Sequence, residues 1–402
     1  MNNKEQIPEK AISTAAAGAA SKGMLPFILA FIASCTTPER TPFTLADQEA
    51  AKVPGYQNIR FYADMPATEL ATRRTLFLPR GAGRDGRSNW LVLSSGGAGG
   101  AFGAGVLAGW SERGDRPEFD LVTGVSAGAL IAPFAFVGSV ADSRLATLFT
   151  SVSSAKLNKS RSLLAGVLGQ GAIPASSLRG LIDAHIDADL IERIAARHRA
   201  GARLLVVTTN LDAERSVVWD LGAIAASDMP DKLDLFSVVL EASASIPAIF
   251  APVRISVSGN GASFEELHAD GGAIRQTYLV PDAFYADNDL GGMRPDIHAI
   301  VNGELAPSFA VTPQQSIRIA ERALSSLEKS SATRGITEIA TFARQNRATF
   351  RLMYIDRHIS ANPKLAFDPD YMRAAFALGQ AKGRAGAWEF GPPIGTDLLE
   401  SD

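Results

Sequence analysis

From residue 88 to residue 380, short apolar runs alternate with stretches in which apolar residues recur at helical spacing. The apolar runs predict strands at 90–93, 119–123, 203–209, 217–219, 296–301 and 350–355, and a hairpin that joins 253–257 to 264–269 around a turn at 258–261. The helical spacing predicts helices at 102–112, 127–137, 145–161, 178–199, 233–243, 314–329 and 335–347. A last helix is predicted to begin after Asp368 and to end at Gly379. This alternation predicts an α/β fold, with a mostly parallel sheet covered by helices on both faces.

The pattern before residue 88 is different. Residues 1–23 are polar and rich in Ala and Ser, residues 24–35 are mostly apolar, and prolines then recur without clear periodicity. We predict a tether or N-terminal extension over 36–87, with a short strand near 59–62 and a turn-rich end at 81–87. The folded domain is therefore predicted to begin near Ser88.

The apolar segment 24–35 has the length of a signal-peptide core and is shorter than the roughly 20 residues of a membrane-spanning helix. Its end, Ile32-Ala33-Ser34-Cys35, resembles a bacterial lipobox, and Cys35 is the only cysteine of the chain. This resemblance implies a signal peptide over 1–35, lipidation of Cys35 and a lipid anchor in a bacterial cell envelope. Thr36 after the cysteine resembles a signal for the outer membrane, facing the periplasm. Met24 is an alternative start, and a buried helix with an inert cysteine is the alternative structure.

Composition narrows the class of protein. The chain has 402 residues, of which 46% are hydrophobic and 20% charged, so it is long enough to bury a large core. A formal net charge of −3 without a long basic run argues against nucleic acid as the main partner. The single cysteine excludes an intrachain disulfide and a metal site built on several thiolates.

The strand at 119–123 ends in Gly124-Val125-Ser126-Ala127-Gly128, and an apolar helix follows. This order predicts a strand, a sharp turn and a helix, with Ser126 raised at the amino end of that helix. The helix dipole and free N–H groups there favour developing negative charge. Gly124 and Gly128 fit a turn that leaves no room for side chains beside the serine.

A glycine-rich turn, Ser94-Ser95-Gly96-Gly97-Ala98-Gly99-Gly100, follows the first predicted strand. Successive glycines allow backbone N–H groups to converge on one point and bind an anion, such as the oxygen of a tetrahedral intermediate. Gly103-x-Gly105-x-x-Ala108 also matches a dinucleotide-binding fingerprint in letters, but it lies inside the predicted helix rather than at its start. A second alternative is that these glycines serve only close packing of the helix.

Asp270-Gly271-Gly272 ends the second strand of the predicted hairpin. A carboxylate there can face the Ser126 turn across the ends of the strands, and the alternative is an ordinary Asp-Gly turn. A Ser-His-Asp triad would need a histidine, and His298 or His358 follow the acid in chain order. Neither lies in a turn or glycine-rich context, so we interpret both as structural.

Three motifs in this order carry a family resemblance: Ser95-Gly96-Gly97-Ala98-Gly99-Gly100, Gly124-Val125-Ser126-Ala127-Gly128 and Asp270-Gly271-Gly272. Together they resemble the patatin-like phospholipases, which are lipid acyl hydrolases with a Ser–Asp dyad and no catalytic histidine. Two further stretches look familial, Asn210-Leu211-Asp212 before Val217-Val218-Trp219-Asp220, and Ala242-Ser243-Ala244-Ser245-Ile246-Pro247.

The resemblance implies a three-layer α/β/α sandwich over 88–380, followed by a C-terminal tail at 381–402. It implies that Ser126 is the nucleophile and Asp270 the base of a serine esterase that needs no cofactor or metal. The implied oxyanion hole is the backbone around Gly96, Gly97 and Ala98, and the implied substrate is a phospholipid or another acyl-ester lipid. Gly124 and Gly128 shape the nucleophile turn, and Gly271 and Gly272 complete the acid motif.

The glycine-rich motif departs from the family pattern at two positions. The family usually has Gly-Gly-Gly-x-Arg/Lys-Gly, whereas this chain has Ser95 in place of the first glycine and Gly99 at the basic position. Backbone donors survive both changes, but the missing cation leaves the substrate class open. Two alternatives therefore remain: a lipid-binding lipoprotein without catalysis, and a Ser-His-Asp esterase that acts on a soluble ester.

Overall fold

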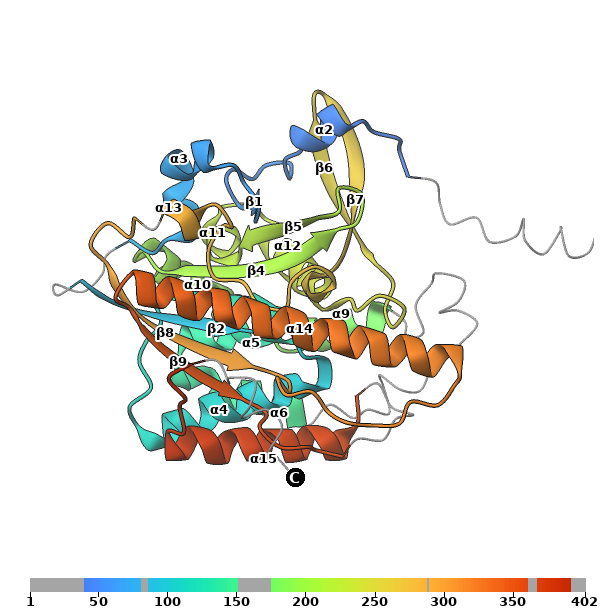
Figure 1. The fold of residues 1–402 in the computed structure, drawn as a ribbon. Helices are drawn as coiled ribbons and strands as arrows, with labels where there is room; N and C mark the ends of the chain where they lie inside the picture. Colours follow the sequence, from blue (N-terminus) through green and yellow to red (C-terminus); the bar gives the residue numbers. More distant parts are fainter. Residues whose placement is uncertain (1–39, 81–85, 151–174, 288, 361–366, 392–402) are drawn as a thin grey trace, which may run out of the picture. The chain divides into compact units, whose positions relative to one another are not determined.

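The computed structural model describes residues 40–80, 86–150, 175–287, 289–360 and 367–391 (Figure 1). The predicted signal peptide and Cys35 lie outside the described residues, as do residues 151–161 of the helix predicted at 145–161. The chain divides into two units between Pro42 and Phe43, and the second unit, Phe43–Asp402, contains the sheet and its helices.

A nine-stranded sheet forms the centre of this unit, with the strand order β1-β5-β4-β3-β2-β8-β9 and with β7 and β6 attached to β4. The five strands β4, β3, β2, β8 and β9 are parallel, while β1, β5, β7 and β6 pair antiparallel. The strands are β1 Arg60–Tyr62, β2 Arg87–Leu93, β3 Leu121–Val125, β4 Arg203–Asn210, β5 Arg215–Asp220, β6 Val253–Gly259, β7 Ala262–Asp270, β8 Arg294–Val301 and β9 Thr349–Tyr354. The predicted α/β fold with a mostly parallel sheet is confirmed.

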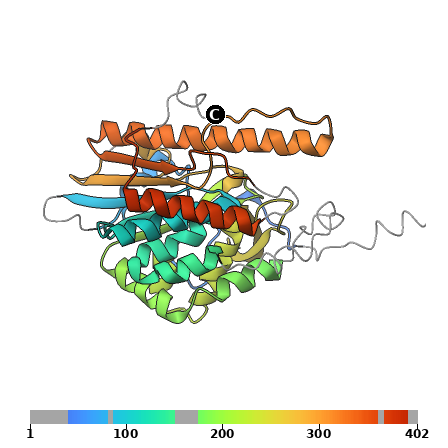
Figure 2. The same cartoon turned by 90° about the horizontal axis from the view of Figure 1, so that it is seen from below.

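Helices cover both faces of the sheet, so that the unit has three layers (Figure 2). On one face the core lies under α4 Gly100–Arg113, α5 Ala127–Val137, α6 Asp142–Thr150, α9 Ala175–Asp183, α10 Ala188–Arg199, α11 Leu221–Ala226, α12 Lys232–Ala244 and α15 Pro369–Ala385. On the other face a second core lies under α3 Ala67–Phe77, α13 Phe284–Asp287 and α14 Ser316–Gln345. The central strands read as continuous apolar runs because both of their faces are buried.

Glycines allow α4 and α15 to pack backbone against backbone. A Cβ at Gly105 would lie 2.1 Å from the carbonyl oxygen of Phe376, and one at Gly379 would lie 2.1 Å from that of Phe102. Gly105 of the fingerprint-like stretch therefore serves helix packing, whereas a Cβ at Gly103 would lie 2.4 Å from Oδ1 of Asn302. The prediction that Gly379 ends the last helix was wrong, because this close contact holds Gly379 inside α15, which ends before Gly386 at a φ of 63°.

The predicted end of the domain at residue 380 was also wrong. Beyond α15, the Glu389 N–H donates to the Leu352 carbonyl at 2.9 Å, and the Leu352 N–H donates back at 2.8 Å. Trp388 packs on Trp110 with 4.7 Å between ring centroids. The first part of the predicted tail thus adds a short bridge to the sheet.

The predicted tether at 36–87 needs a larger correction, because the compact unit begins at Phe43. Phe43 stacks on Phe264 with 4.3 Å between ring centroids. Phe61 pairs with Val218 at the edge of the sheet, and Phe77 in α3 is fully buried. Short elements separated by turns give these apolar residues no common period, which is why their sequence pattern resembled a linker. The short strand expected near 59–62 is present as β1.

Two predicted helix boundaries also differ from the structure. The helix predicted at 178–199 is two helices, because Asp187 caps α10 by accepting a hydrogen bond from the Leu190 N–H. The helices predicted at 314–329 and 335–347 are the single helix α14. Residues 330–334, which separated the two predictions, are helical. Gly335, the first residue of the second predicted helix, allows close contact, because a Cβ there would lie 2.1 Å from the Thr277 hydroxyl oxygen. Within the described ranges, no helix has the length and apolar content needed to cross a membrane.

Candidate active site

Ser126 occupies a strained turn between β3 and α5. Its φ of 56° and ψ of −119° are unusual for a residue other than glycine and cost on the order of 1–3 kcal/mol. A Cβ at Gly124 would lie 2.5 Å from the Gly128 carbonyl oxygen, and one at Gly128 would lie 2.4 Å from the Leu93 carbonyl oxygen. Only glycine fits at either position, as predicted for a turn that raises the serine above the sheet.

Asp270 lies beside this turn although the two residues are 144 positions apart in sequence. It ends β7, which pairs with β4, and β4 in turn pairs with β3, the strand that leads to Ser126. The Ser126 hydroxyl donates a hydrogen bond of 2.5 Å to Oδ2 of Asp270, and the Gly272 N–H donates one of 2.7 Å to Oδ1. Both side chains belong to residues that are only 4% exposed.

The aspartate is held in a form suited to take up a proton. Burial raises the pKa of Asp270 to about 7, because removal from water disfavours the charged carboxylate. The hydrogen bonds from Ser126 and Gly272 oppose this rise in pKa, and the nearby carboxylate of Glu328 adds to it. An aspartate with an ordinary pKa of about 3.9 is a poor base at neutral pH, whereas one near 7 can act as a general base there.

The glycine-rich turn brings backbone donors to the same place. Gly96 and Gly97 have φ values of 157° and 52°, which only glycine adopts easily. Among the described residues, none accepts a hydrogen bond from the N–H groups of Gly96, Gly97 or Ala98. Gly97 and Ser126 line the same pocket. The turn therefore presents unpaired donors beside the serine, which is the requirement for an oxyanion hole.

Polar side chains that the sequence analysis did not single out hold this turn in place. Asn302, which follows β8, donates from Nδ2 to the Ser94 carbonyl at 2.7 Å and accepts from the Gly103 N–H at 3.1 Å. Gln276 accepts a hydrogen bond from the Ser95 hydroxyl and donates to the Gly272 carbonyl at 2.8 Å. Gln276 thus joins the glycine-rich turn to the acid motif. Neither residue lies in a recognisable motif, so sequence alone gave no signal for them.

The backbone of the nucleophile has its own support from α12. The Ser126 N–H donates to the Ser243 hydroxyl at 3.1 Å, and that hydroxyl donates to the Val207 carbonyl at 2.7 Å. Ser243 belongs to the stretch 242–247 that looked familial in sequence. Its contact gives a physical reason for a small hydroxyl residue there, because it links the nucleophile turn to β4.

An apolar pocket opens at Ser126. Apart from Gly97 and Ser126 its walls are hydrophobic, and they are Ala127, Leu130, Leu148, Phe149, Leu178, Leu181, Ala244, Ile246, Phe250, Phe367 and Met372. Its volume is about 40 Å³. Pockets that enclose drug-sized ligands have about 300–1,000 Å³, so the walls must move apart to admit a long acyl chain.

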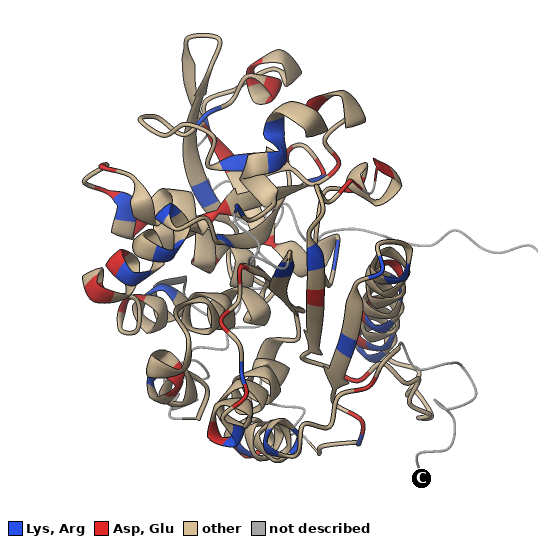
Figure 3. Cartoon of the chain, turned by 90° about the vertical axis from the view of Figure 1, so that its left-hand side faces the viewer, with Lys and Arg blue, Asp and Glu red and all other residues tan. Residues whose placement is uncertain are grey.

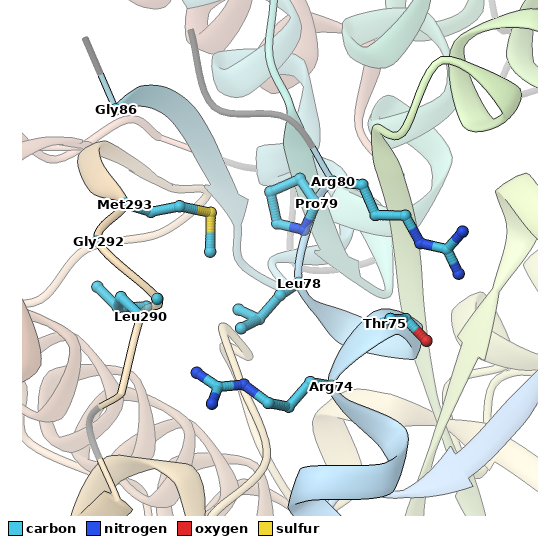
Figure 4. A pocket seen from close by; sticks show the side chains of 10 residues that line it. Arg74, Thr75, Leu78, Pro79, Arg80, Gly86, Leu290, Gly292 and Met293 are labelled. Carbon is cyan, nitrogen blue, oxygen red and sulfur yellow. The ribbon is translucent and has the colours of Figure 1, made fainter. Parts of the chain in front are cut away.

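A wider pocket of about 370 Å³ lies at the amino ends of the parallel strands, whereas Ser126 lies at their carboxyl ends (Figure 4). It is lined by Gly86, which directly precedes β2, and by residues 290–293, which directly precede β8. Ser126 instead follows the carboxyl end of β3, which is parallel to β2. Arg74 at this pocket is paired with Asp289 at 2.7 Å. None of the residues that line it is Ser, Cys, His, Asp or Glu, and we assign the pocket no part in the chemistry.

The two triad candidates lie apart from the serine and the aspartate. His298 is buried between the rings of Trp110 and Trp388, at centroid distances of 4.9 and 5.1 Å. His358 is on the surface, with 78% of its side chain exposed and Nδ1 at 3.4 Å from Glu304. Packing and surface position account for these residues, which agrees with their structural interpretation.

The other three histidines also have structural partners. His268 is fully buried, with Nδ1 at 2.9 Å from the Thr208 hydroxyl and Nε2 at 3.0 Å from Glu266. His185 and His198 are half-buried, with His185 Nδ1 at 3.0 Å from the Leu181 carbonyl oxygen and His198 Nδ1 at 3.5 Å from Asp220. In the part of the chain that the structure describes, no three His, Cys, Asp or Glu side chains are grouped so that they could hold a metal ion.

Comparison with known proteins finds one family model that matches the catalytic part of the chain. Residues 91–281 match the family model for patatin-like phospholipases. Similar crystal structures include VipD from Legionella pneumophila, with 14% identity and a TM-score of 0.37 over 75% of this chain and 67% of VipD. Another is the type III effector protein ExoU, with 13% identity and a TM-score of 0.19 over 74% of this chain and 53% of ExoU. No curated protein sequence matched the chain. Residues 91–281 of this chain are therefore similar to a patatin-like phospholipase domain.

Proposed function

We propose that this protein is a lipid acyl hydrolase that uses Ser126 and Asp270 as a catalytic dyad. The family match supports hydrolysis of lipid esters in general. The observation that carries the finer proposal is the 2.5 Å hydrogen bond from the Ser126 hydroxyl to Asp270, at the mouth of an apolar pocket. The apolar walls suit an acyl chain, whose burial beside the nucleophile brings the ester carbonyl to Ser126.

In the proposed reaction, Ser126 Oγ attacks the ester carbonyl while Asp270 takes the hydroxyl proton. The N–H groups of Gly96, Gly97 and Ala98 bind the oxyanion of the tetrahedral intermediate. When the intermediate collapses, the ester C–O bond breaks, Asp270 returns the proton to the departing alcohol, and the acyl group remains on Ser126. Water then attacks the acyl-enzyme, Asp270 takes its proton and gives it back to Ser126 Oγ, and the fatty acid leaves.

The packing around Gly99 supports a proposal about how the enzyme recognises the lipid headgroup. Gly99 stands where the family usually carries Arg or Lys, and a Cβ there would lie 2.1 Å from the Asn302 carbonyl oxygen. The site cannot accept a basic side chain at this position unless Asn302 moves. We therefore propose that the enzyme selects its substrate by the acyl chain and does not depend on a cation at residue 99 to bind a phosphate.

Lipid profiling tests the proposed function. Membrane lipid extract incubated with wild-type protein should lose acyl-ester lipids and gain free fatty acids together with the matching deacylated lipids. The Ser126→Ala protein is the matched control and should produce neither change. An unchanged lipid profile with the folded wild-type protein would contradict the proposed activity.

We further propose that Cys35 carries a lipid anchor in a bacterial cell envelope, facing the periplasm. The support is the lipobox-like stretch before Cys35 and the position of the only cysteine at its end. Two or more acyl chains on one cysteine give stable anchoring, whereas one chain is marginal. Expressed in bacteria, the wild-type protein should fractionate with membranes and take up labelled fatty acid. The Cys35→Ser protein should take up none, and equal labelling of both would contradict the anchor.

A further inference from the structure

The first half of α14 has an apolar face that points away from the protein. Ile319, Leu324 and Leu327 are each more than half exposed, and Phe309 and Val311 in the preceding loop are 95% and 85% exposed. We call these five residues the outer apolar face. They are five of the eleven large hydrophobic side chains that are exposed in the described part of the chain, although they lie within only nineteen residues.

The polarity of this half of the helix is the reverse of that in an ordinary surface helix. Two of its cations bind the loop that precedes the helix: Lys329 Nζ donates to Glu304 at 3.0 Å and to the Ala306 carbonyl at 3.1 Å, and Arg322 donates to Ser308. Leu327 lies two residues from Lys329 and therefore on about the opposite side of the helix. Two cations of the polar side are thus bound to the loop at 304–308, and the apolar side has no such partner within the described residues.

The second half of α14 is an ordinary core helix. Ala332, Ile336, Ile339 and Ala343 recur at helical spacing and are buried against the sheet. Ile336 and Leu327 are nine residues apart, which is about two and a half turns, so the core face and the outer apolar face lie on opposite sides. Packing of α14 on its own sheet therefore gives no account of the outer apolar face.

The outer apolar face lies at the catalytic end of the sheet. The loop before α14 begins at Asn302, which directly follows the carboxyl end of β8 and binds the glycine-rich turn. Glu328 is close enough to Asp270 that its carboxylate contributes to the raised pKa of that residue. In Figures 1 and 2 the N-terminal end of α14 reaches past the carboxyl ends of β8 and β9.

The charge of α14 indicates what this surface meets. Acidic and basic residues are interspersed over the unit (Figure 3), and the whole chain has a net charge of −3. Within α14, however, five cations stand against three carboxylates. The cations are Arg318, Arg322, Lys329, Arg334 and Arg344. An exposed apolar stripe on a helix with excess positive charge is typical of helices that lie in the interface of an anionic bilayer.

We propose that the outer apolar face inserts into the surface of an anionic lipid bilayer and so brings the mouth of the Ser126 pocket to its substrate. This inference rests on the proposed function, because it concerns how a lipid ester reaches that site. The five side chains enter the boundary between headgroups and acyl chains, while exposed cations such as Arg334 contact lipid phosphates. The contact is separate from any anchor at Cys35, because it lies on the catalytic unit itself.

Vesicle binding tests the proposal without requiring catalysis. Full-length protein with Ser126→Ala and Cys35→Ser is sedimented with phosphatidylcholine vesicles that contain or lack phosphatidylglycerol. We expect stronger binding to the anionic vesicles, and a loss of roughly tenfold or more when Leu324→Glu and Leu327→Glu are added, because two carboxylates would enter the apolar boundary. The control is Val140→Glu, which alters a residue that is 72% exposed and follows the carboxyl-terminal end of α5. It should bind as the parent does.

A second measurement separates this inference from the proposed function. With Ser126 restored, the double variant should hydrolyse vesicle lipid roughly tenfold more slowly, yet hydrolyse monomeric p-nitrophenyl butyrate at the parental rate. If the parent with Ser126 restored does not hydrolyse the monomeric ester, this result contradicts the proposed hydrolase and leaves the binding result intact. Unchanged vesicle binding by the double variant would overturn the inference. The inference would also be overturned if sedimentation equilibrium showed the parent as a dimer and the double variant as a monomer. The outer apolar face would then bind a second copy of the chain.

Discussion

Replacing Ser126 with alanine is expected to lower kcat for a p-nitrophenyl acyl ester by about 10⁴-fold or more, since the covalent route is lost entirely. The fold should survive, because the Ser126 N–H and not its hydroxyl makes the bond to Ser243 that ties the turn to α12. A residual rate above that in water would come from the donors of the glycine-rich turn and from binding in the apolar pocket.

Two companion measurements make this result specific. A fluorophosphonate probe should label the folded wild-type protein at Ser126 and leave Ser126→Ala unlabelled. His358→Ala and His298→Ala should keep most of the activity, because neither histidine lies at the serine or the aspartate. A folded histidine variant without activity would favour a triad hydrolase. Failure of the probe to label the folded wild-type protein would favour a lipid-binding protein without catalysis.

Asp270→Asn is expected to abolish hydrolysis and to stabilise the protein at the same time. An amide cannot take the proton of Ser126, so kcat should fall by at least about 10³-fold. In the wild-type protein, kcat/KM should rise with pH through an apparent pKa of about 7, because the protonated carboxyl present below that pH cannot act as a base.

The stability effect follows from the same burial. The pKa of Asp270 is raised from 3.8 to about 7 in the folded state, so the unfolded chain releases this proton at a lower pH than the folded protein does. Below about pH 4 both states are protonated and the group costs nothing. Stability is then lost as the pH rises from about 4 to about 7, by up to roughly 4 kcal/mol, and remains lower above pH 7. The neutral asparagine avoids this cost.

Thermal unfolding of wild type and Asp270→Asn at several pH values checks the sign. The variant should have the higher Tm at pH 8, and the difference should shrink as the pH is lowered toward 4. Ser126→Ala is the matched control, because it also removes activity but leaves the buried carboxyl in place. An Asp270→Asn protein that is less stable than wild type at pH 8 would contradict the assignment of a buried carboxyl with a raised pKa.

Local patterns in the sequence were sufficient to predict most of the strands and helices that form the site and the chemical groups that they carry. Strand β3, the turn at Ser126 and helix α5 follow from an apolar run, two glycines and a second apolar run, because each depends only on neighbouring residues. The hairpin of β6 and β7 likewise follows from two apolar runs around Asn260-Gly261. The family resemblance then linked Ser126 to Asp270, a pair that no local pattern connects.

The sequence pattern gave wrong predictions where apolar residues have no common period or where small residues make a distant contact. Residues 43–80 resembled a tether, yet Phe61 and Phe77 are buried. The two short elements β1 and α3 contribute only one or two buried apolar residues each, so no common period is visible. Gly379 resembled a helix end, and residues 330–334, just before Gly335, resembled a break between helices. In both places small residues permit close contact with a distant segment, and that contact cannot be deduced from its own neighbourhood.

By itself, the sequence determined which groups are available: a serine in a glycine turn, a run of backbone donors, an aspartate that ends a strand, and helical segments at 314–329 and 335–347. Only the tertiary structure decided how they act, because pairing of β7 with β4 places Asp270 at 2.5 Å from Ser126 and burial raises the pKa of that carboxyl. It also decided the orientation of α14, whose cations bind the loop at 304–308 and whose leucines are left outside. Burial and orientation depend on residues far apart in the chain, and local periodicity contains no information about them.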